Sequence, residues 1–333
     1  MGASCIQRQR QQFKQQEAAK LPPKLSEELN SIMEGGLWNL KACARGCDQD
    51  VNLIVNDNKI MVLKRGSRRH LAHSMLAAKL LESSSVPIPH VVCGDAKGNS
   101  GIAGWGYLVE TAACGEEMWL VYGDLSAETR EGIWMHLGEL MATFHNIKMI
   151  GYGDVGFDGK GAHERYPGVP SEDLDGFLKA EVVSLEEMKA LKSYLQSEKV
   201  IRMNRNVVES VMIHADLEMD NLFVDRKAAK ISAIIDWADL QCGPRSEDFA
   251  RLYCRLHEDP KCWKALLDGY SKLATPPSIK EIELRTVELL LWLLPGKRDA
   301  ANKNEDNGIG TKKQLVEDFR RCKQLLLSIV APR

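Results

Sequence analysis

The residues of this chain best suited to chemistry lie close together in segment 211–225, VMIHADLEMDNLFVD. Five polar side chains stand there between two apolar runs, whereas a turn needs only one or two. Three of them follow the spacing His-x-Asp-x-x-x-x-Asn, namely His214, Asp216 and Asn221. Asp236 follows at the end of the next apolar run, KISAII. One hairpin-like unit therefore supplies two carboxylates and a carboxamide.

This set of side chains is what phosphoryl transfer from ATP requires of a protein. A carboxylate must orient the attacking hydroxyl and accept its proton, and oxygen ligands must hold the Mg²⁺ that bridges the phosphates. On this interpretation Asp216 is the catalytic base, Asn221 and Asp236 are the metal ligands, and His214 braces the loop. The alternative for Asp216 is an Asx turn between two strands.

Periodicity predicts the elements that must position these residues. Two short strands, 51–55 and 59–64, flank a polar turn and indicate a hairpin. Residues 68–82 have apolar positions at helical spacing, and the prolines of SSSVPIP end that helix. Ser126 is expected to cap a helix that runs to about Asn146.

The order of these elements predicts two lobes. A small β-rich lobe is followed by a connecting strand and a larger helical lobe, so the expected fold class is α+β. We assign residues 1–24 to a polar N-terminal arm, 25–111 to the N-terminal lobe and 112–333 to the helical C-terminal lobe. Within the last of these, residues 296–313 are expected to form a loop.

Composition narrows the class of protein. The 333 residues are 44% hydrophobic and 27% charged, enough for a sizeable core in two lobes. The net charge of −2 argues against a nucleic-acid binder. Nine scattered cysteines without a CxxC pair argue against zinc and favour the cytoplasm. The longest apolar run, 289–294, is too short for a transmembrane segment, and the N-terminus has no apolar signal region.

Four motifs occur in a fixed order: VPIP, LGELMATFHNIKMIGYG, HADLEMDN and AIIDWADLQCGPRSEDFARL. In order and approximate spacing they resemble those of the aminoglycoside phosphotransferase and choline kinase superfamily, over about residues 40–255. The HAD…IIDW form is similar to hygromycin phosphotransferases somewhat more than to the common HGD form. The resemblance implies the bilobal protein-kinase-like fold. It also implies an enzyme that uses ATP or GTP, with Mg²⁺, to phosphorylate a hydroxyl of a small molecule.

The resemblance also implies residues that bind the nucleotide. Lys64, which ends the strand MVLKRG, is similar to the family's strand lysine that contacts the α and β phosphates; a solvated strand-end lysine is the alternative. The stretch CARGCDQDVNLIV is similar to the nucleotide-positioning loop, with Gly46 as its one glycine and with Asp48 and Gln49 near the phosphates; a simple turn is the alternative.

Two further motifs are similar to parts of the family's site. LVETAACGEEM resembles the hinge between the lobes, where backbone groups of Glu110, Thr111 and Ala112 would meet the adenine edge. Asp248, in GPRSEDFARL, resembles the family's buried aspartate that supports the catalytic loop.

One feature departs from the family's pattern. The strand lysine is usually paired with a glutamate of the following helix, but residues 65–81 contain no Asp or Glu. The expected place is near His73 or Ser74, and the first acid, Glu82, comes about two turns too late. Either Lys64 has another partner, or the pair is absent and phosphate binding is weaker. The sequence thus leaves two functions open, a phosphotransferase and a catalytically inactive kinase-like domain that binds a ligand or a protein.

Overall fold

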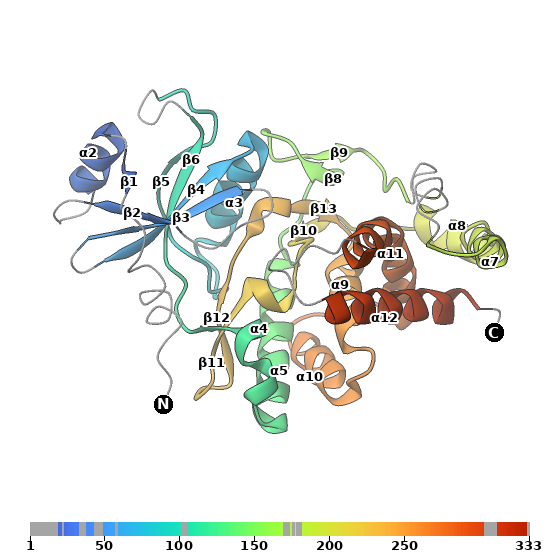
Figure 1. Cartoon of the computed structure of the whole chain (residues 1–333). Coiled ribbons are helices and arrows are strands. Elements are labelled where there is room, and N and C mark those ends of the chain that lie inside the picture. Colours follow the sequence, from blue (N-terminus) through green and yellow to red (C-terminus); the bar gives the residue numbers. More distant parts are fainter. Residues whose placement is uncertain are drawn as a thin grey trace.

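The chain folds into two lobes, a smaller one built on an antiparallel sheet and a larger, mainly helical one (Figure 1). This arrangement confirms the predicted α+β, bilobal fold class. The computed structural model describes residues 19–21, 23–32, 38–42, 49–56, 59–100, 105–168, 174, 177, 182–302 and 312–331.

The smaller lobe contains a six-stranded sheet in the order β1-β2-β3-β4-β6-β5, with antiparallel neighbours throughout. The predicted hairpin is confirmed at its centre, where Val55 lies opposite Ile60. Strand β1 falls within the range predicted as an arm, yet it pairs with β2; the boundary at residue 24 stays a prediction. The strands are β1 (Ala19–Lys20), β2 (Asn39–Ala42), β3 (Gln49–Val55), β4 (Ile60–Gly66), β5 (Val91–Asp95) and β6 (Tyr107–Thr111).

The larger lobe is organised around helix α5 (Ala127–Phe144), whose N-terminus confirms the predicted cap. Ser126 Oγ accepts a hydrogen bond from the Thr129 N–H at 3.1 Å. The other helices are α4 (Met118–Val121), α7 (Leu185–Leu195), α8 (Glu198–Arg205), α9 (Ser246–Leu256), α10 (Pro260–Ser271), α11 (Ile279–Asn302) and α12 (Lys312–Val330), with 3₁₀ turns η2 (Tyr122–Asp124), η3 (Met219–Asn221) and η4 (Trp237–Asp239). Short strands form two small sheets: β10 (Val211–Ile213), β13 (Gln241–Gly243), β8 (Tyr152–Val155) and β9 (Gly161–His163) in one, and β12 (Lys230–Ile234), β11 (Leu222–Asp225) and β7 (Glu116–Glu117) in the other.

The two faces of the six-stranded sheet differ because side chains alternate along each strand. Leu63 on β4 and Val109 on β6 are buried in an apolar core with helix α2 (Pro23–Ile32). Lys64 and Glu110 come one position later on the same strands, so they lie on the opposite face. The sheet thus places two charged side chains on the face that meets the larger lobe.

Helix α3 (Arg68–Leu81) fastens the lobes together. Its buried His73 has Nδ1 2.8 Å from the carbonyl oxygen of Ala238 in η4, and Nε2 2.6 Å from that of Val155 in β8. Both carbonyl groups belong to the larger lobe. The helix position near which the family pattern leads one to expect a glutamate is therefore occupied by a histidine that connects the lobes.

Helix α11 shows that part of the loop predicted for residues 296–313 was wrong. The helix continues through Pro295 and the glycine after it, although both residues disfavour helix. Leu290 and Leu294 are fully buried in a second core shared with α12, and this packing outweighs the local signals. Residues 303–311 lie outside the described part. Among the described helices, none combines the length and the apolarity that crossing a membrane requires.

Helices α5 and α10 approach each other through a pair of glycines. A Cβ atom added at Gly138 would overlap the carbonyl oxygen of Leu266, and one added at Gly269 would overlap that of Met135. Backbone stands against backbone at both points, so neither neighbour can swing away as a flexible side chain would. The contact requires a residue without a side chain on each helix.

We expect Gly269→Ala to lower the free energy of unfolding by about 2 kcal/mol, because the helices must separate to admit the methyl group. Gly296→Ala is the matched control, since that glycine also lies in a helix and has open space around it. The control is expected to be neutral or up to about 1 kcal/mol more stable. Urea denaturation compares the two; equal stability would show that the helix contact is not as close as described.

Candidate active site

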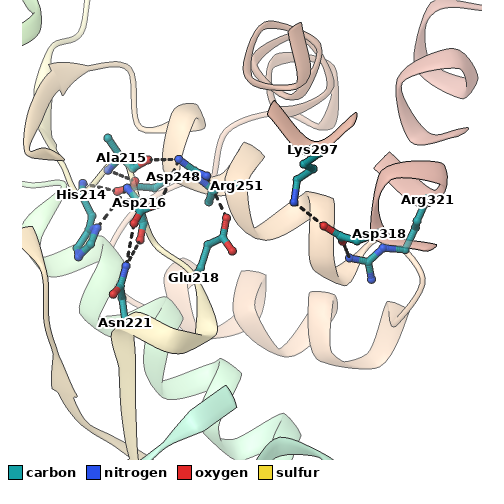
Figure 2. A network of polar contacts seen from close by, with 10 residues as sticks. All are labelled: His214, Ala215, Asp216, Glu218, Asn221, Asp248, Arg251, Lys297, Asp318 and Arg321. Carbon is teal, nitrogen blue, oxygen red and sulfur yellow. Dashed lines mark hydrogen bonds and ion pairs between the residues drawn. The ribbon is translucent and has the colours of Figure 1, made fainter. Parts of the chain in front are cut away.

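One buried carboxylate, Asp248 at the start of α9, anchors the loop between β10 and β11 (Figure 2). Its Oδ2 accepts the N–H of His214 and its Oδ1 accepts that of Ala215, both at 2.9 Å. His145 Nε2 lies 3.1 Å from the same Oδ2. Burial alone would raise the pKa of Asp248, but the hydrogen bonds from the His145 ring and the His214 N–H outweigh it and lower the pKa. These contacts support the predicted supporting role of Asp248.

The anchor holds the chain in a sharp bend. Ala215 has φ 65°, in the left-handed region that residues other than glycine rarely adopt. The buried His214 has Nε2 2.9 Å from the Ile235 carbonyl oxygen, while its Nδ1 accepts the Asp216 N–H at 3.3 Å. The neutral tautomer with a proton on Nε2 satisfies both partners. The predicted bracing role of His214 agrees with these contacts.

Both carboxylate oxygens of Asp216 have a partner, as Figure 2 shows. Asn221 Nδ2 donates to Oδ2 at 3.0 Å and to the Asp216 carbonyl at 2.8 Å. Arg251 Nη2 lies 3.2 Å from Oδ1 and donates to the Ala215 carbonyl at 3.0 Å, while its Nη1 donates to Glu218 at 3.0 Å. The Asp216 side chain is 33% exposed. The carboxylate is therefore fixed in direction and still open to a ligand.

The two predicted metal ligands lie just beyond the paired ends of strands β11 and β12. The Ile235 N–H donates to the Asn221 carbonyl at 3.0 Å, and Asp236 is the next residue. Asp236 leaves the strand in a left-handed conformation, φ 61° and ψ 60°. Because the Asn221 amide nitrogen is committed to Asp216, its Oδ1 is left as an oxygen ligand.

The charges around this point fit a hard cation. Burial raises the pKa of Asp239, and the charges of Asp216 and Asp236 raise it further. Burial also raises the pKa of Asp220, with Glu218 and Asp216 adding to it. In the part of the chain that is described, no three His, Cys, Asp or Glu side chains form a metal site alone. Two protein oxygens completed by phosphates and water are the arrangement that suits Mg²⁺.

A cleft joins Lys64 to Asp236. Lys64 Nζ lies 2.8 Å from Oε1 of Glu110, so Lys64 does have a partner other than a helix glutamate. Burial would lower the pKa of Lys64, but Glu110 and Asp236 outweigh it and raise the pKa. The same cleft is lined by Ser74, Ala78, Ile88, Pro89, Val91 and Trp237.

Comparison with known proteins identifies the family of this chain. Residues 39–282 match the model of the phosphotransferase enzyme family, APH. The chain belongs to this family. The resemblance inferred from the four motifs is thereby confirmed. No curated protein matches the chain in sequence.

Solved structures of aminoglycoside phosphotransferases share the fold. A thermostable variant of APH(4)-Ia, in a ternary complex with AMP-PNP and hygromycin B, is 16% identical with a TM-score of 0.62, covering 91% of this chain and 98% of that one. APH(2″)-Ib with ADP is 14% identical with a TM-score of 0.54 over 94% and 100%. The streptomycin–ATP complex of APH(2″)-IIa is 13% identical with a TM-score of 0.57 over 94% and 100%. At these identities the likeness concerns the fold.

The roles that the family pattern implies for the nucleotide loop and the hinge stay predictions. Gly46 and Asp48 lie outside the described residues. The Thr111 N–H donates to the His90 carbonyl at 2.9 Å, so it is not open to a ligand. Ala112, the first residue after β6, makes no hydrogen bond within the described part of the chain. Of the three predicted hinge residues, Ala112 is thus the one whose backbone groups have no partner within the described residues.

The sequence-based predictions missed three side chains that shape the cleft and its loop. Arg251 lies three positions after Asp248 on helix α9, so both face the same loop, and this spacing is visible in SEDFARL. His73 gave no such signal, because the two carbonyl oxygens beside its ring nitrogens belong to residues far away in the sequence. The side chain of Glu110 was also overlooked, since only its backbone was expected to matter.

We expect Asp248→Asn to lower the free energy of unfolding by about 3 kcal/mol, because an amide cannot accept all three hydrogen bonds. Wild-type stability from this group is present above the unfolded pKa, near 4, and is lost as the pH falls through the lower folded pKa. The Asp248→Asn variant should lack this pH-dependent part of the free energy of unfolding. Asp268→Asn, in an exposed pair with Lys264, is the control. Unchanged hydrogen exchange at the His214 and Ala215 amides would contradict the anchoring role.

Proposed function

We propose that the chain is an ATP- and Mg²⁺-dependent phosphotransferase that phosphorylates a hydroxyl of a small polar molecule. The observation that carries the proposal is the Asp216 carboxylate, fixed by Asn221 and Arg251 beside the oxygen ligands of Asn221 and Asp236. Family membership supports the reaction class. Relatives in fold that were crystallised with AMP-PNP or ADP support an adenine nucleotide as donor.

Each residue has a role that follows from its surroundings. Asp216 orients the acceptor hydroxyl and takes its proton as the new P–O bond forms. Arg251 and Asn221 keep its carboxylate in one direction. Lys64, held protonated in the cleft, binds phosphate oxygens. Mg²⁺ bound by Asn221 and Asp236 would offset the negative charge of the phosphates.

The alternative, an inactive kinase-like binding module, depended on the missing helix glutamate. The Lys64–Glu110 pair removes that reason, since the lysine is partnered and buried in the cleft. No observation within the described residues favours the module over the enzyme.

The acceptor is proposed only as a class. Fold relatives were solved with hygromycin B and with streptomycin, so aminoglycosides belong in a first screen together with amino alcohols and sugars. A cytoplasmic location is proposed because the cysteines of the described part are free thiols, as a reducing compartment would keep them: Cys93, Cys114, Cys242, Cys254, Cys262 and Cys322.

Asp216→Asn tests the proposal directly. The variant keeps the size of the side chain but loses the charge that accepts the proton, so transfer to a confirmed acceptor should slow by at least about a hundredfold. Mg·ATP affinity and melting temperature should stay close to wild type. Phosphate transfer is measured with labelled ATP, and Asp268→Asn serves as the unaffected control. Full turnover in the variant would reduce Asp216 to a turn residue.

Asp236→Asn tests the metal assignment. Asn tolerates the left-handed conformation at this position but gives a weaker ligand. The Mg²⁺ concentration for half-maximal activity should rise at least about tenfold. Binding of ATP without Mg²⁺ should not weaken, because one negative charge near the phosphates has gone. An unchanged Mg²⁺ requirement would refute the assignment.

A further inference from the structure

We propose that the side chain of Glu110 is the positioning residue that aims Lys64 at the nucleotide phosphates, so that this chain holds its lysine within the sheet and not through helix α3. The proposal rests on the proposed function. It assigns a role to a carboxylate that the mechanism above does not use, on a residue whose backbone alone was expected to matter.

The sheet register brings the two side chains together. Strands β4 and β6 are antiparallel, with Val62 opposite Glu110 and Lys64 opposite Leu108. Lys64 and Glu110 are therefore diagonal neighbours on one face, a relation that long side chains can bridge. Their charged atoms lie 2.8 Å apart, and both residues are buried, at 6% and 7% exposure.

The charges in the cleft favour Glu110 over Asp236 as the anion that stays paired with Lys64. Burial disfavours the ammonium, while the carboxylates of Glu110 and Asp236 favour it. A cation bound by Asp236 would offset the negative charge of that carboxylate, so that it would stabilise the Lys64 ammonium less. Glu110 would then be the anion that keeps Lys64 protonated while it contacts phosphate.

Helix α3 offers no competing partner. It contains no acid, and its Ser74, which lines the same cleft, donates its hydroxyl to the His70 carbonyl at 3.1 Å. His73 is turned to carbonyls of the larger lobe. Among the described residues, Glu110 makes the one ion pair to Lys64. Because the pair sits on hydrogen-bonded neighbouring strands, a shift of helix α3 does not break it.

The test compares Glu110→Gln with a variant that returns the acid to the helix, Glu110→Gln combined with Ser74→Glu. In Glu110→Gln we expect ATP affinity to fall about tenfold while adenosine affinity changes less than about threefold, because only ATP carries the groups that Lys64 contacts. The double variant should recover most of the ATP affinity. Glu116→Gln, which removes an acid from the more exposed pair with Arg226, is the matched control.

A second readout does not depend on turnover. Loss of Glu110 leaves Lys64 buried with less opposing charge, so its ammonium gives up its proton more readily. Labelling of Lys64 by an amine-reactive reagent near neutral pH, followed by mass spectrometry, should rise about tenfold in Glu110→Gln and return toward wild type in the double variant. If Glu110→Gln does not fold, Glu110→Asp replaces it. The expected loss of ATP affinity relative to adenosine affinity is then smaller.

The outcomes separate the two proposals. Equal loss of ATP and adenosine, or unchanged Lys64 labelling, would overturn the positioning role of Glu110. Wild-type protein that binds ATP but transfers phosphate to no acceptor would count against the proposed function, while the labelling result would still support or refute the ion pair.

Discussion

The carboxylate of Asp248 accepts hydrogen bonds from two consecutive backbone N–H groups, and the direction of the loop between β10 and β11 depends on it. Without that acceptor, the left-handed conformation of Ala215 would have no compensation, and Asp216 would leave the bend in another direction. The same helix carries Arg251, whose guanidinium forms an ion pair with the Asp216 carboxylate. One rigid element, α9, thus fixes both the backbone of this loop and the side chain of Asp216, a more precise support than a loop could give.

Two tasks, joining the lobes and positioning Lys64, belong to different elements of this structure. Helix α3 joins the lobes through His73, and the sheet itself aligns Lys64 through Glu110. The cleft is consequently built from parts with separate supports. Changes in the packing of α3 should alter how the lobes sit on each other more than how the lysine is aimed.

Local patterns in the sequence were enough to predict much of this. The β3–β4 hairpin, the Ser126 cap and the spacing of Asp216, Asn221 and Asp236 all depend on residues near one another in the chain. The Lys64–Glu110 pair could not be predicted, because it depends on the register between strands distant in sequence. The loop predicted for residues 296–313 was too long because the polar composition of that segment is a local signal, whereas the burial of leucines against α12 is a tertiary one.

Asp236 shows how this site constrains the evolution of the chain. An aspartate at φ 61° costs about 1 kcal/mol relative to glycine, which adopts this conformation without strain. Replacing it by glycine would relieve that strain and also reduce the crowding of carboxylates around Asp239. A copy of the gene no longer selected for activity would therefore have no reason to keep the strained residue. Retention of an aspartate here, in a set of related sequences, would be a sign of continued selection for the chemistry and not for the fold.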